Sequence, residues 1–287
     1  MATTVNQSFL QLKTNLEITG LQQQTVSSRQ QYVRDAVAKD LKVLDTFLTG
    51  SYRRSTMIAP LKAADIDVFV ILDSSYFKSK GQKWLLGKVK TTLKKTYPTT
   101  PRISRNGQAV TVRFTDFTID VVPAFNRKGG GYLIADSPNA RWIPTDPNKH
   151  VDIWSSANAK HKSNLVPLIK MLKKWNKQNG ALLRSFHLEA MILEILDNVE
   201  ISDFSSGSRF IFDKARQAVK GKTADPSGYG GNLAGYLTLQ KINNVVSRLD
   251  SAYKRAKIAE MLDERGKTSQ AIQKWRLIFG KEFPAYG

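Results

Sequence analysis

The sequence predicts an α+β protein, in which a mixed sheet-and-helix domain over residues 1–150 is followed by a mostly helical domain over residues 151–287. Two observations predict this division. Strand runs and hairpin signals are confined to the chain before Pro147. After it, apolar side chains recur at helical spacing. Because a cleft between two such layers is a natural ligand site, we expect the functional residues to line it.

The individual elements follow from hydrophobic periodicity and from turn residues. In the first domain we expect a helix over 24–45, a strand and turn over 43–51, a central strand over 66–72, a helix over 81–98 that stops at Pro98, two or three strands over 101–125 and a hairpin over 129–147. Asn106-Gly107 is a typical hairpin turn. In the second domain the helix-like segments are 165–180, 185–199, 208–221 and the long stretch 232–279.

The charge of the chain points to polyanionic partners. Its 44 Lys and Arg against 24 Asp and Glu give a formal net charge of +20 and a pI near 10. Residues 1–150 hold 22 Lys and Arg against 11 Asp and Glu, so the charge belongs to the folded body rather than to a tail. Such a field favours nucleoside triphosphates, nucleic acids or an acidic surface.

The chain contains no cysteine, which excludes disulfides, thiolate zinc sites and cysteine nucleophiles. The N-terminal residues have no apolar core of signal-peptide length, and no stretch approaches the length of a membrane span. We therefore expect a cytoplasmic protein that does not associate with a membrane.

Two aspartates open the predicted central strand. Asp65 and Asp67 are two residues apart, so their side chains share one face of the strand. The same alternation places Asp116, Thr118 and Asp120 on one face of a later strand. Neighbouring carboxylates repel, and a divalent cation resolves that conflict. Three such groups from adjacent strands could hold two metal ions about 4 Å apart for phosphoryl chemistry.

A Gly50-Ser51 turn precedes these aspartates by about fifteen residues. Glycine lets a backbone approach a phosphate closely, and amides at the start of a helix point at anions. Alone, a Gly-Ser pair or an Asp-x-Asp pair is a weak signal. Together, and with Asp120 ahead of Val-Val-Pro, they indicate a metal-dependent nucleotide site.

The combination resembles the nucleotidyltransferase fold of the polymerase-β superfamily. More narrowly, the chain is similar to the bacterial CD-NTases, relatives of cyclic GMP-AMP synthase and oligoadenylate synthase that make cyclic oligonucleotide second messengers in anti-phage defence. The likeness extends from Leu48 to the final helix, and it is carried by five stretches: GSYRRSTMIAPLKAADIDV, IDVVPAF, WIPTDPNKH, LIKMLKKWN and SFHLEAM.

The resemblance implies an NTP-using nucleotidyltransferase that depends on Mg²⁺, for which Mn²⁺ can substitute. Residues 1–150 would form its catalytic domain with N-terminal helices, and 151–287 the helical domain that closes the active-site cleft. The implied metal ligands and catalytic residues are Asp65, Asp67 and Asp120, of which Asp120 also activates the acceptor hydroxyl. The implied triphosphate ligands are Gly50, Ser51, Lys173 and Ser185.

One position departs from the family pattern, because Arg54-Ser55-Thr56 stands where relatives often have Arg-Gly-Thr. Some relatives end in glycine and are joined through it to other molecules, which makes Gly287 a candidate conjugation site, although residues 285–287 also look like a frayed end. His187, among apolar neighbours, is expected to be a hydrogen-bonded core residue. Trp142, Tyr132 and Tyr52 are candidates both for base stacking and for core packing.

Seven lysines surround the predicted helix over 81–98, namely Lys78, Lys80, Lys83, Lys88, Lys90, Lys94 and Lys95. They form either a solvated face or a surface for a polyanion or a regulatory nucleic acid. Two rival functions stay open from the sequence: an RNA-tailing enzyme of the poly(A) or CCA-adding kind, and a non-catalytic nucleic-acid-binding protein.

Overall fold

A computed structural model describes residues 2–99 and 102–287. Positions 1, 100 and 101, which fall within the predicted first domain, lie outside the described residues. The chain divides into two compact units. Residues 18–152 form the sheet unit, and the residues up to Glu17 together with Ile153–Gly287 form the helical unit.

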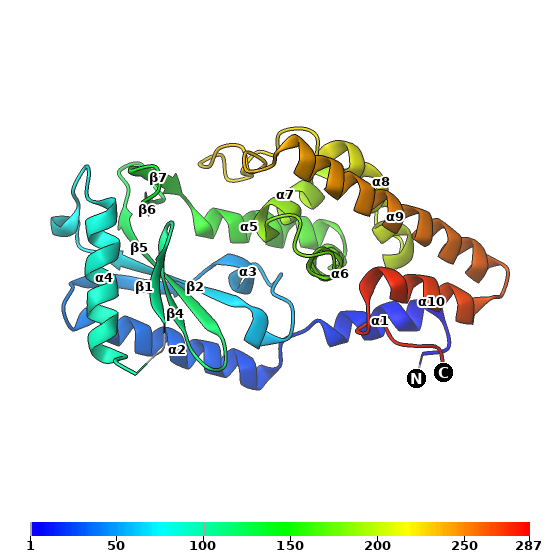
Figure 1. Ribbon diagram of the computed structural model, residues 1–287, viewed down its shortest axis with the longest axis horizontal. Helices are drawn as coiled ribbons and strands as arrows, with labels where there is room; N and C mark the ends of the chain where they lie inside the picture. Colours follow the sequence, from blue (N-terminus) through cyan, green and yellow to red (C-terminus); the bar gives the residue numbers. More distant parts are fainter. Residues whose placement is uncertain (1, 100–101) are drawn as a thin grey trace. The chain divides into compact units, whose positions relative to one another are not determined.

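The described residues of the sheet unit form seven strands, the helices α2 and α4, the single helical turn α3 and two short 3-10 turns (Figure 1). The strands are β1 (Val43–Leu48), β2 (Asp65–Leu72), β3 (Ile103–Asn106), β4 (Ala109–Arg113), β5 (Thr118–Asn126), β6 (Tyr132–Asp136) and β7 (Arg141–Thr145). The helices are α2 (Gly20–Ala38), the single turn α3 (Gly50–Arg53) and α4 (Gln82–Thr96). The strand order is β1-β2-β5-β4-β3, and β6 continues along β5 and pairs with β7. Among the described strands only β2 and β5 pair in parallel, so the sheet is mixed.

One face of this sheet is covered by α2 and α4, which also contact each other. The residues that face these helices alternate along each strand, as a half-buried strand requires. They include Ile66, Val68 and Val70 of β2 and Ile119 and Val121 of β5, all completely or almost completely buried. Their partners on the helices form the rest of the main core, which includes Val26, Val33, Val37, Leu85, Leu86, Val89 and Leu93.

The other face carries the intervening residues. Toward the end of β2 and β5 these are apolar, and Phe69, Ile71, Val122 and Ala124 form a second, smaller cluster with Ile134 of β6. At the beginning of the same strands they are polar, because Asp65, Asp67 and Asp120 occupy this face. The acidic residues therefore lie on the side of the sheet opposite α2 and α4.

The helical unit contains seven helices (Figure 1). They are α1 (Val5–Asn15), α5 (Pro147–Lys160), α6 (Leu165–Gln178), α7 (Ser185–Leu196), α8 (Phe204–Ala218), α9 (Leu239–Glu264) and α10 (Thr268–Phe279), and the division between the units falls within α5. The segment 232–279, expected as one long helical stretch, is two helices separated at Arg265, Gly266 and Lys267.

Helix α1 belongs to the helical unit, whereas the expected catalytic domain over 1–150 includes this helix; those domain boundaries stay a prediction. The helix joins this unit through the aromatic core around Phe9, whose ring lies 4.9 Å from Trp275 and 5.1 Å from Phe283 by centroid distance. The helix begins at a capping box in which Thr4 accepts from the amide of Gln7 and Gln7 accepts from the amide of Thr4.

The expectation of a frayed end over 285–287 is not met at Tyr286 and Gly287, whose backbones contact Ala2. Tyr286 pairs with Ala2 in an isolated parallel bridge, and both chain ends lie side by side in Figure 1. Asn15 donates to the carbonyl of Glu282 at 2.8 Å. Within the described residues, none of the helices has the length and apolarity needed to cross a membrane.

Candidate active site

The predicted metal ligands are brought together by strand register. Asp67 of β2 lies directly opposite Asp120 of β5, and Asp65 lies opposite Thr118. In a parallel pair, opposed residues project to the same face, so all three carboxylates stand on the face away from α2 and α4. The structure thus gathers Asp65, Asp67 and Asp120 from two neighbouring strands onto one acidic face.

Asp120 is held by a neighbouring hydroxyl. Strand β5 lies between β2 and β4, and Thr111 of β4 is the residue directly opposite Asp120 in the β4–β5 pair. Oγ1 of Thr111 donates to Oδ1 of Asp120 at 2.5 Å. Burial raises the pKa of the Asp120 carboxyl above its ordinary value; the hydrogen bond from Thr111 opposes this rise, and the negative charge of Asp65 adds to it. The carboxylates therefore repel each other here, as the sequence predicted.

The Gly-Ser turn lies against the same aspartates. Strand β1 ends at Leu48, the amide of Thr49 donates to the carbonyl of Asp67 at 2.9 Å, and the turn α3 begins at Gly50. Gly50 has a φ of 62°, and a Cβ placed on it would lie 1.8 Å from Oδ2 of Asp67. Only glycine fits this position. Glycine adopts the left-handed backbone conformation without strain, and it has no Cβ to collide with the Asp67 carboxylate.

The turn continues through the position where the sequence departs from the family pattern. Ser55 is exposed and has a φ of 59°, a left-handed conformation that glycine adopts more readily than serine. The carbonyl of Ser51 accepts from the amides of Thr56 and Met57 at 2.9 and 3.0 Å. The turn is therefore closed by backbone hydrogen bonds, and Ser55 within it has a backbone conformation better suited to glycine.

The donor set fits a hard divalent cation, because all three side chains offer carboxylate oxygens. Yet in residues 2–99 and 102–287 no group of three or more His, Asp or Glu side chains is arranged so that it could hold a metal ion. The two observations agree when part of the coordination comes from substrate. Mg²⁺ is usually bound by one or two carboxylates together with waters and substrate phosphates.

Asp116 does not share this face, which corrects the expected alternation. It precedes the start of β5 at Thr118 and sits in the turn after β4. Its Oδ2 lies 3.3 Å from Nη2 of Arg29 on α2, and the Arg29 guanidinium lies 4.5 Å from the centre of the Phe114 ring. The physical reason is that alternation applies only within a strand, and Asp116 pairs with a cation instead.

Lys173 and Ser185 belong to the helical unit, on α6 and at the start of α7. Ser185 is exposed. Lys173 is 7% exposed and its Nζ lies 2.9 Å from Oε1 of Glu189, which is fully buried. The predicted triphosphate lysine therefore has a carboxylate partner on the next helix, a partner that the sequence did not indicate.

His187 is a hydrogen-bonded core residue, as expected. Its Nδ1 lies 3.0 Å from the Tyr236 hydroxyl and its Nε2 lies 3.1 Å from the Thr223 hydroxyl. The Tyr236 hydroxyl also accepts from the amide of Arg184 at 2.8 Å. His187 thus joins the start of α7 to the segment between α8 and α9.

Two of the aromatic residues considered for base stacking are engaged in packing. Trp142 donates from Nε1 to the carbonyls of Lys78 and Ser79, and its ring packs against Phe77 in a tilted arrangement. Tyr132 packs against Phe47 and Phe69. These contacts favour the core-packing alternative for both residues.

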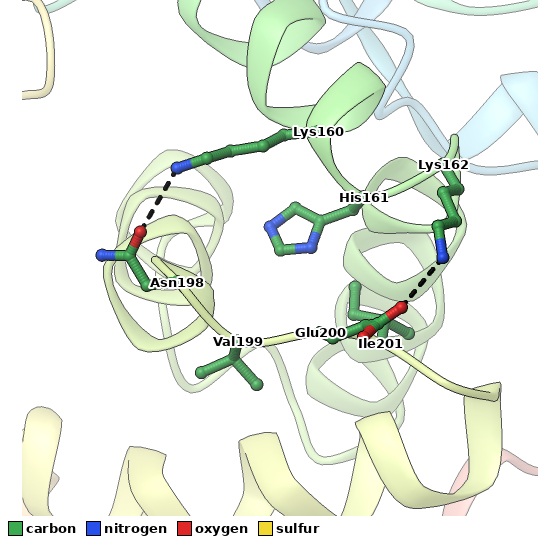
Figure 2. Close-up of a pocket in the computed structure, with 7 residues that line it drawn as sticks. All are labelled: Lys160, His161, Lys162, Asn198, Val199, Glu200 and Ile201. Atoms are coloured by element: carbon green, nitrogen blue, oxygen red, sulfur yellow. Dashed lines mark hydrogen bonds and ion pairs between the residues drawn. The ribbon is translucent and has the colours of Figure 1, made fainter.

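The helical unit also has a pocket of about 220 Å³ lined by residues 160–162 and 198–201. Figure 2 shows that its lysines are already engaged: Lys162 pairs with Glu200 at 2.8 Å, and Lys160 reaches Asn198 at 3.5 Å. Burial lowers the pKa of His161, the third basic residue there. None of the predicted site residues lines this pocket.

Three partner residues were not predicted from the sequence. Thr111 contacts Asp120, Glu189 contacts Lys173, and Arg29 contacts Asp116. Thr111 could have been found, because the Asn106-Gly107 turn and strand alternation together put it on the acidic face. No local signal marks Glu189, whose pairing depends on how two helices pack.

Residues 3–158 match the Second Messenger Oligonucleotide or Dinucleotide Synthetase (SMODS) domain, over more than half of the chain. The chain belongs to the SMODS family. It is 26% identical, over 98% of its length and 86% of the relative's, to a cyclic AMP-AMP-AMP synthase of Acinetobacter. It is 24% identical to a probable cyclic nucleotide synthase of Bacillus cereus, over 83% and 81% of the two chains.

Solved structures of two nucleotide-related bacterial proteins share the fold. The structure of Escherichia coli CdnC with ATP superposes with a TM-score of 0.78 at 16% identity, covering 98% and 99% of the two chains. Vibrio cholerae DncV cyclic AMP-GMP synthase gives 0.68 at 17% identity, over 84% and 69%. The expected α+β fold of the polymerase-β type, the resemblance to CD-NTases and the expectation of a nucleotidyltransferase enzyme are therefore confirmed.

Proposed function

We propose that this SMODS protein is a metal-dependent, template-independent nucleotidyltransferase that joins NTPs into a cyclic di- or oligonucleotide second messenger. The observation that carries the proposal is the register of Asp67 with Asp120 on a sheet face that Asp65 shares, beside a turn closed around Gly50. The names of the curated relatives, which are cyclic nucleotide synthases, support the cyclic product.

Asp65, Asp67 and Asp120 would supply carboxylate oxygens to Mg²⁺, or to Mn²⁺ in its place, and oxygens of the bound triphosphate would complete the coordination. The bound ion supplies charge neutralisation for the triphosphate and makes the acceptor hydroxyl easier to deprotonate. The 3′- or 2′-hydroxyl oxygen of the acceptor attacks the α-phosphorus of the donor, the bond to the leaving pyrophosphate breaks, and the hydroxyl proton passes to Asp120. A second transfer of the same kind closes the ring.

The other site residues act on the triphosphate. The Gly50 backbone and the Ser51 hydroxyl are proposed to contact its oxygens, since a turn of this kind presents amides to anions. The same role for Lys173 and Ser185 stays a prediction from the family pattern. Lys173 would exchange the Glu189 carboxylate for phosphate oxygens when it takes up that role.

We infer cytoplasmic signalling in anti-phage defence as the setting. A polyanion or regulatory nucleic acid is proposed to contact the seven lysines around α4, a stretch from Ser74 to Thr99 with no acidic residue. Trp84 on this helix is 40% exposed, with Lys78 Nζ 4.1 Å from its ring centre. Conjugation through Gly287 is a further proposal, which mass spectrometry of the C-terminal peptide from cells with the partner genes tests.

The test is to incubate the purified protein with all four NTPs and Mg²⁺ or Mn²⁺ and to analyse phosphatase-resistant products by high-resolution mass spectrometry. We expect a cyclic product from the wild type and none from Asp67→Ala. A wild-type protein without such a product, or an Asp67→Ala variant as active as wild type, would contradict the proposal.

The same experiment separates the rivals. Elongation of added RNA, without a cyclic product, would favour an RNA-tailing enzyme. Salt-dependent nucleic-acid binding that survives EDTA, without turnover of any NTP, would favour a non-catalytic binding protein.

A further inference from the structure

The two oxygens of the Asp120 carboxylate have different surroundings. Oδ1 accepts the short hydrogen bond from Thr111, at 2.5 Å. Within the described residues no hydrogen bond reaches Oδ2. One oxygen is thus fixed by the protein, and the other is left to an external partner.

We propose that Thr111 is a positioning residue, whose hydroxyl orients the Asp120 carboxylate by holding Oδ1 so that Oδ2 faces the metal and the acceptor. The inference deepens the proposed function and rests on it. None of the family motifs quoted above includes strand β4. The inference gives this strand a part in the reaction.

Three features make Thr111 suited to this role. It is 5% exposed, so water does not compete for its hydroxyl. It is β-branched and sits in a strand, so its side chain has few conformations available. It lies directly opposite Asp120 in the strand pair, so the position of its hydroxyl is set by the backbone pairing of β4 and β5 rather than by a mobile loop.

The direction of the hydrogen bond also matters. An ionised carboxylate only accepts, so the Thr111 hydroxyl must donate its proton to Oδ1. Hydrogen bonds to an ionised acceptor are roughly twice as strong as neutral ones, which gives the orientation its rigidity.

A purely structural alternative exists, in which Thr111 only satisfies a buried carboxylate. It predicts that removing the hydroxyl lowers stability and leaves metal affinity unchanged. Positioning predicts a weaker metal site. Partners that hydrogen-bond to metal ligands typically contribute about 10- to 100-fold to metal affinity or activity.

The experiment compares Mn²⁺ binding to the full-length protein in the presence of a saturating non-hydrolysable NTP analogue, followed by electron paramagnetic resonance, for wild type, Thr111→Val, Thr111→Ser and Asp67→Ala. Thr111→Val is nearly isosteric and removes the hydroxyl, whereas Thr111→Ser keeps it. We expect Thr111→Val to weaken Mn²⁺ binding by about tenfold or more and Thr111→Ser to restore most of the affinity. Thr111→Ala serves the same purpose as valine if the valine variant does not fold.

Thr92→Val is the matched control. Thr92 is also buried, and its hydroxyl also contacts a carboxylate, Oδ2 of Asp40 at 3.1 Å, but on α4 at the opposite face of the sheet. The control removes the same kind of hydrogen bond by the same substitution, so we expect a change in thermal stability with unchanged Mn²⁺ affinity.

The outcomes distinguish this inference from the proposed function. If Asp67→Ala loses Mn²⁺ binding while Thr111→Val binds like wild type, Thr111 has only a structural role and the inference is overturned. If Asp67→Ala binds Mn²⁺ as tightly as wild type, the metal site itself is wrong, and the proposed function fails first. Equal weakening in Thr111→Val and Thr92→Val would also overturn the inference, because it would reflect general destabilisation.

Discussion

Lys173 on α6 and Glu189 on α7 form an ion pair in the interior of the helical unit, with Nζ and Oε1 2.9 Å apart. The Glu189 side chain is completely buried. The attraction within a buried ion pair largely offsets the cost of removing both charges from water, so the loss of one partner leaves the other charge with too little compensation. The lysine that the family pattern assigns to the triphosphate is thus also a residue on which the fold depends.

Lys173→Ala is therefore expected to lower the free energy of unfolding by about 3–5 kcal/mol, the range for one partner removed from a buried pair. Urea denaturation followed by circular dichroism measures the change. The double variant Lys173→Met/Glu189→Leu should recover most of the stability, because it removes both charges. An alanine variant as stable as wild type would show that the pair does not persist in solution.

The matched comparison is Lys162→Ala. Lys162 pairs with Glu200 at a similar distance, 2.8 Å, but both side chains are 78% exposed. Exposed pairs contribute little because water and salt screen them, so we expect no measurable change in stability. If Lys173→Ala loses activity, the loss can be assigned to triphosphate binding only after this stability measurement has shown that the variant is folded.

Ser55→Gly should stabilise the protein by about 1 kcal/mol, the cost of holding a non-glycine residue in the left-handed region. Ser55 has a φ of 59° and is exposed, so removal of its side chain leaves no cavity. Ser251→Gly, at an exposed position within α9, should instead destabilise, because glycine is a poor helix former. Thermal denaturation of both variants is the measurement, and a stabilising effect of both would contradict the conformational argument.

Gly50→Ala is expected to lower nucleotidyl transfer on the order of a hundredfold, because it displaces a proposed catalytic group. Its Cβ would lie 1.8 Å from Oδ2 of Asp67, so the carboxylate must move. Gly107→Ala is the control: Gly107 has nearly the same φ, 61°, but a Cβ there meets nothing within 4 Å. Both variants carry the backbone strain, and only Gly50→Ala moves Asp67. Equal activity loss in the two variants, measured as initial rates of pyrophosphate release, would rule out the contact as the cause.

The acidic face was predictable because its determinants are local. Strand alternation places Asp65 and Asp67 together, and the Val-Val-Pro sequence after Asp120 marks the second strand. Which carboxylate belongs to the face depends on where the strand begins, and this is a boundary that alternation alone does not determine. Asp116 was for that reason assigned to a face it does not reach.

What the sequence did not predict depends on contacts between distant segments. The aromatic cluster around Phe9 links α1 to residues more than 260 positions later, which moves α1 out of the sheet unit. The partner of Lys173 is selected by the packing of α6 on α7. Neither relationship leaves a pattern in the neighbouring residues, since apolar and charged side chains at helical spacing are compatible with many partners.

The stability of the helical unit should fall as the pH is lowered from about 6.5 toward 4 because of His187. Burial, and then the positive charge of Arg184, lower the pKa of His187 to about 4 from an ordinary value of 6.5. Below pH 6.5 the unfolded chain binds a proton that the folded protein does not, so His187 contributes full stability above that pH and loses about 3 kcal/mol by pH 4. Tyr236 and Thr223 hydrogen-bond to the neutral ring, in which one nitrogen donates and the other accepts; protonation would require the hydroxyl at the accepting nitrogen to reverse its role. Urea denaturation across this pH range should show that the free energy of unfolding depends less on pH in His187→Gln than in wild type.

His161→Gln is the control, since His161 is less buried. A pH dependence that is reduced in His161→Gln and not in His187→Gln would show that His187 is not the responsible group.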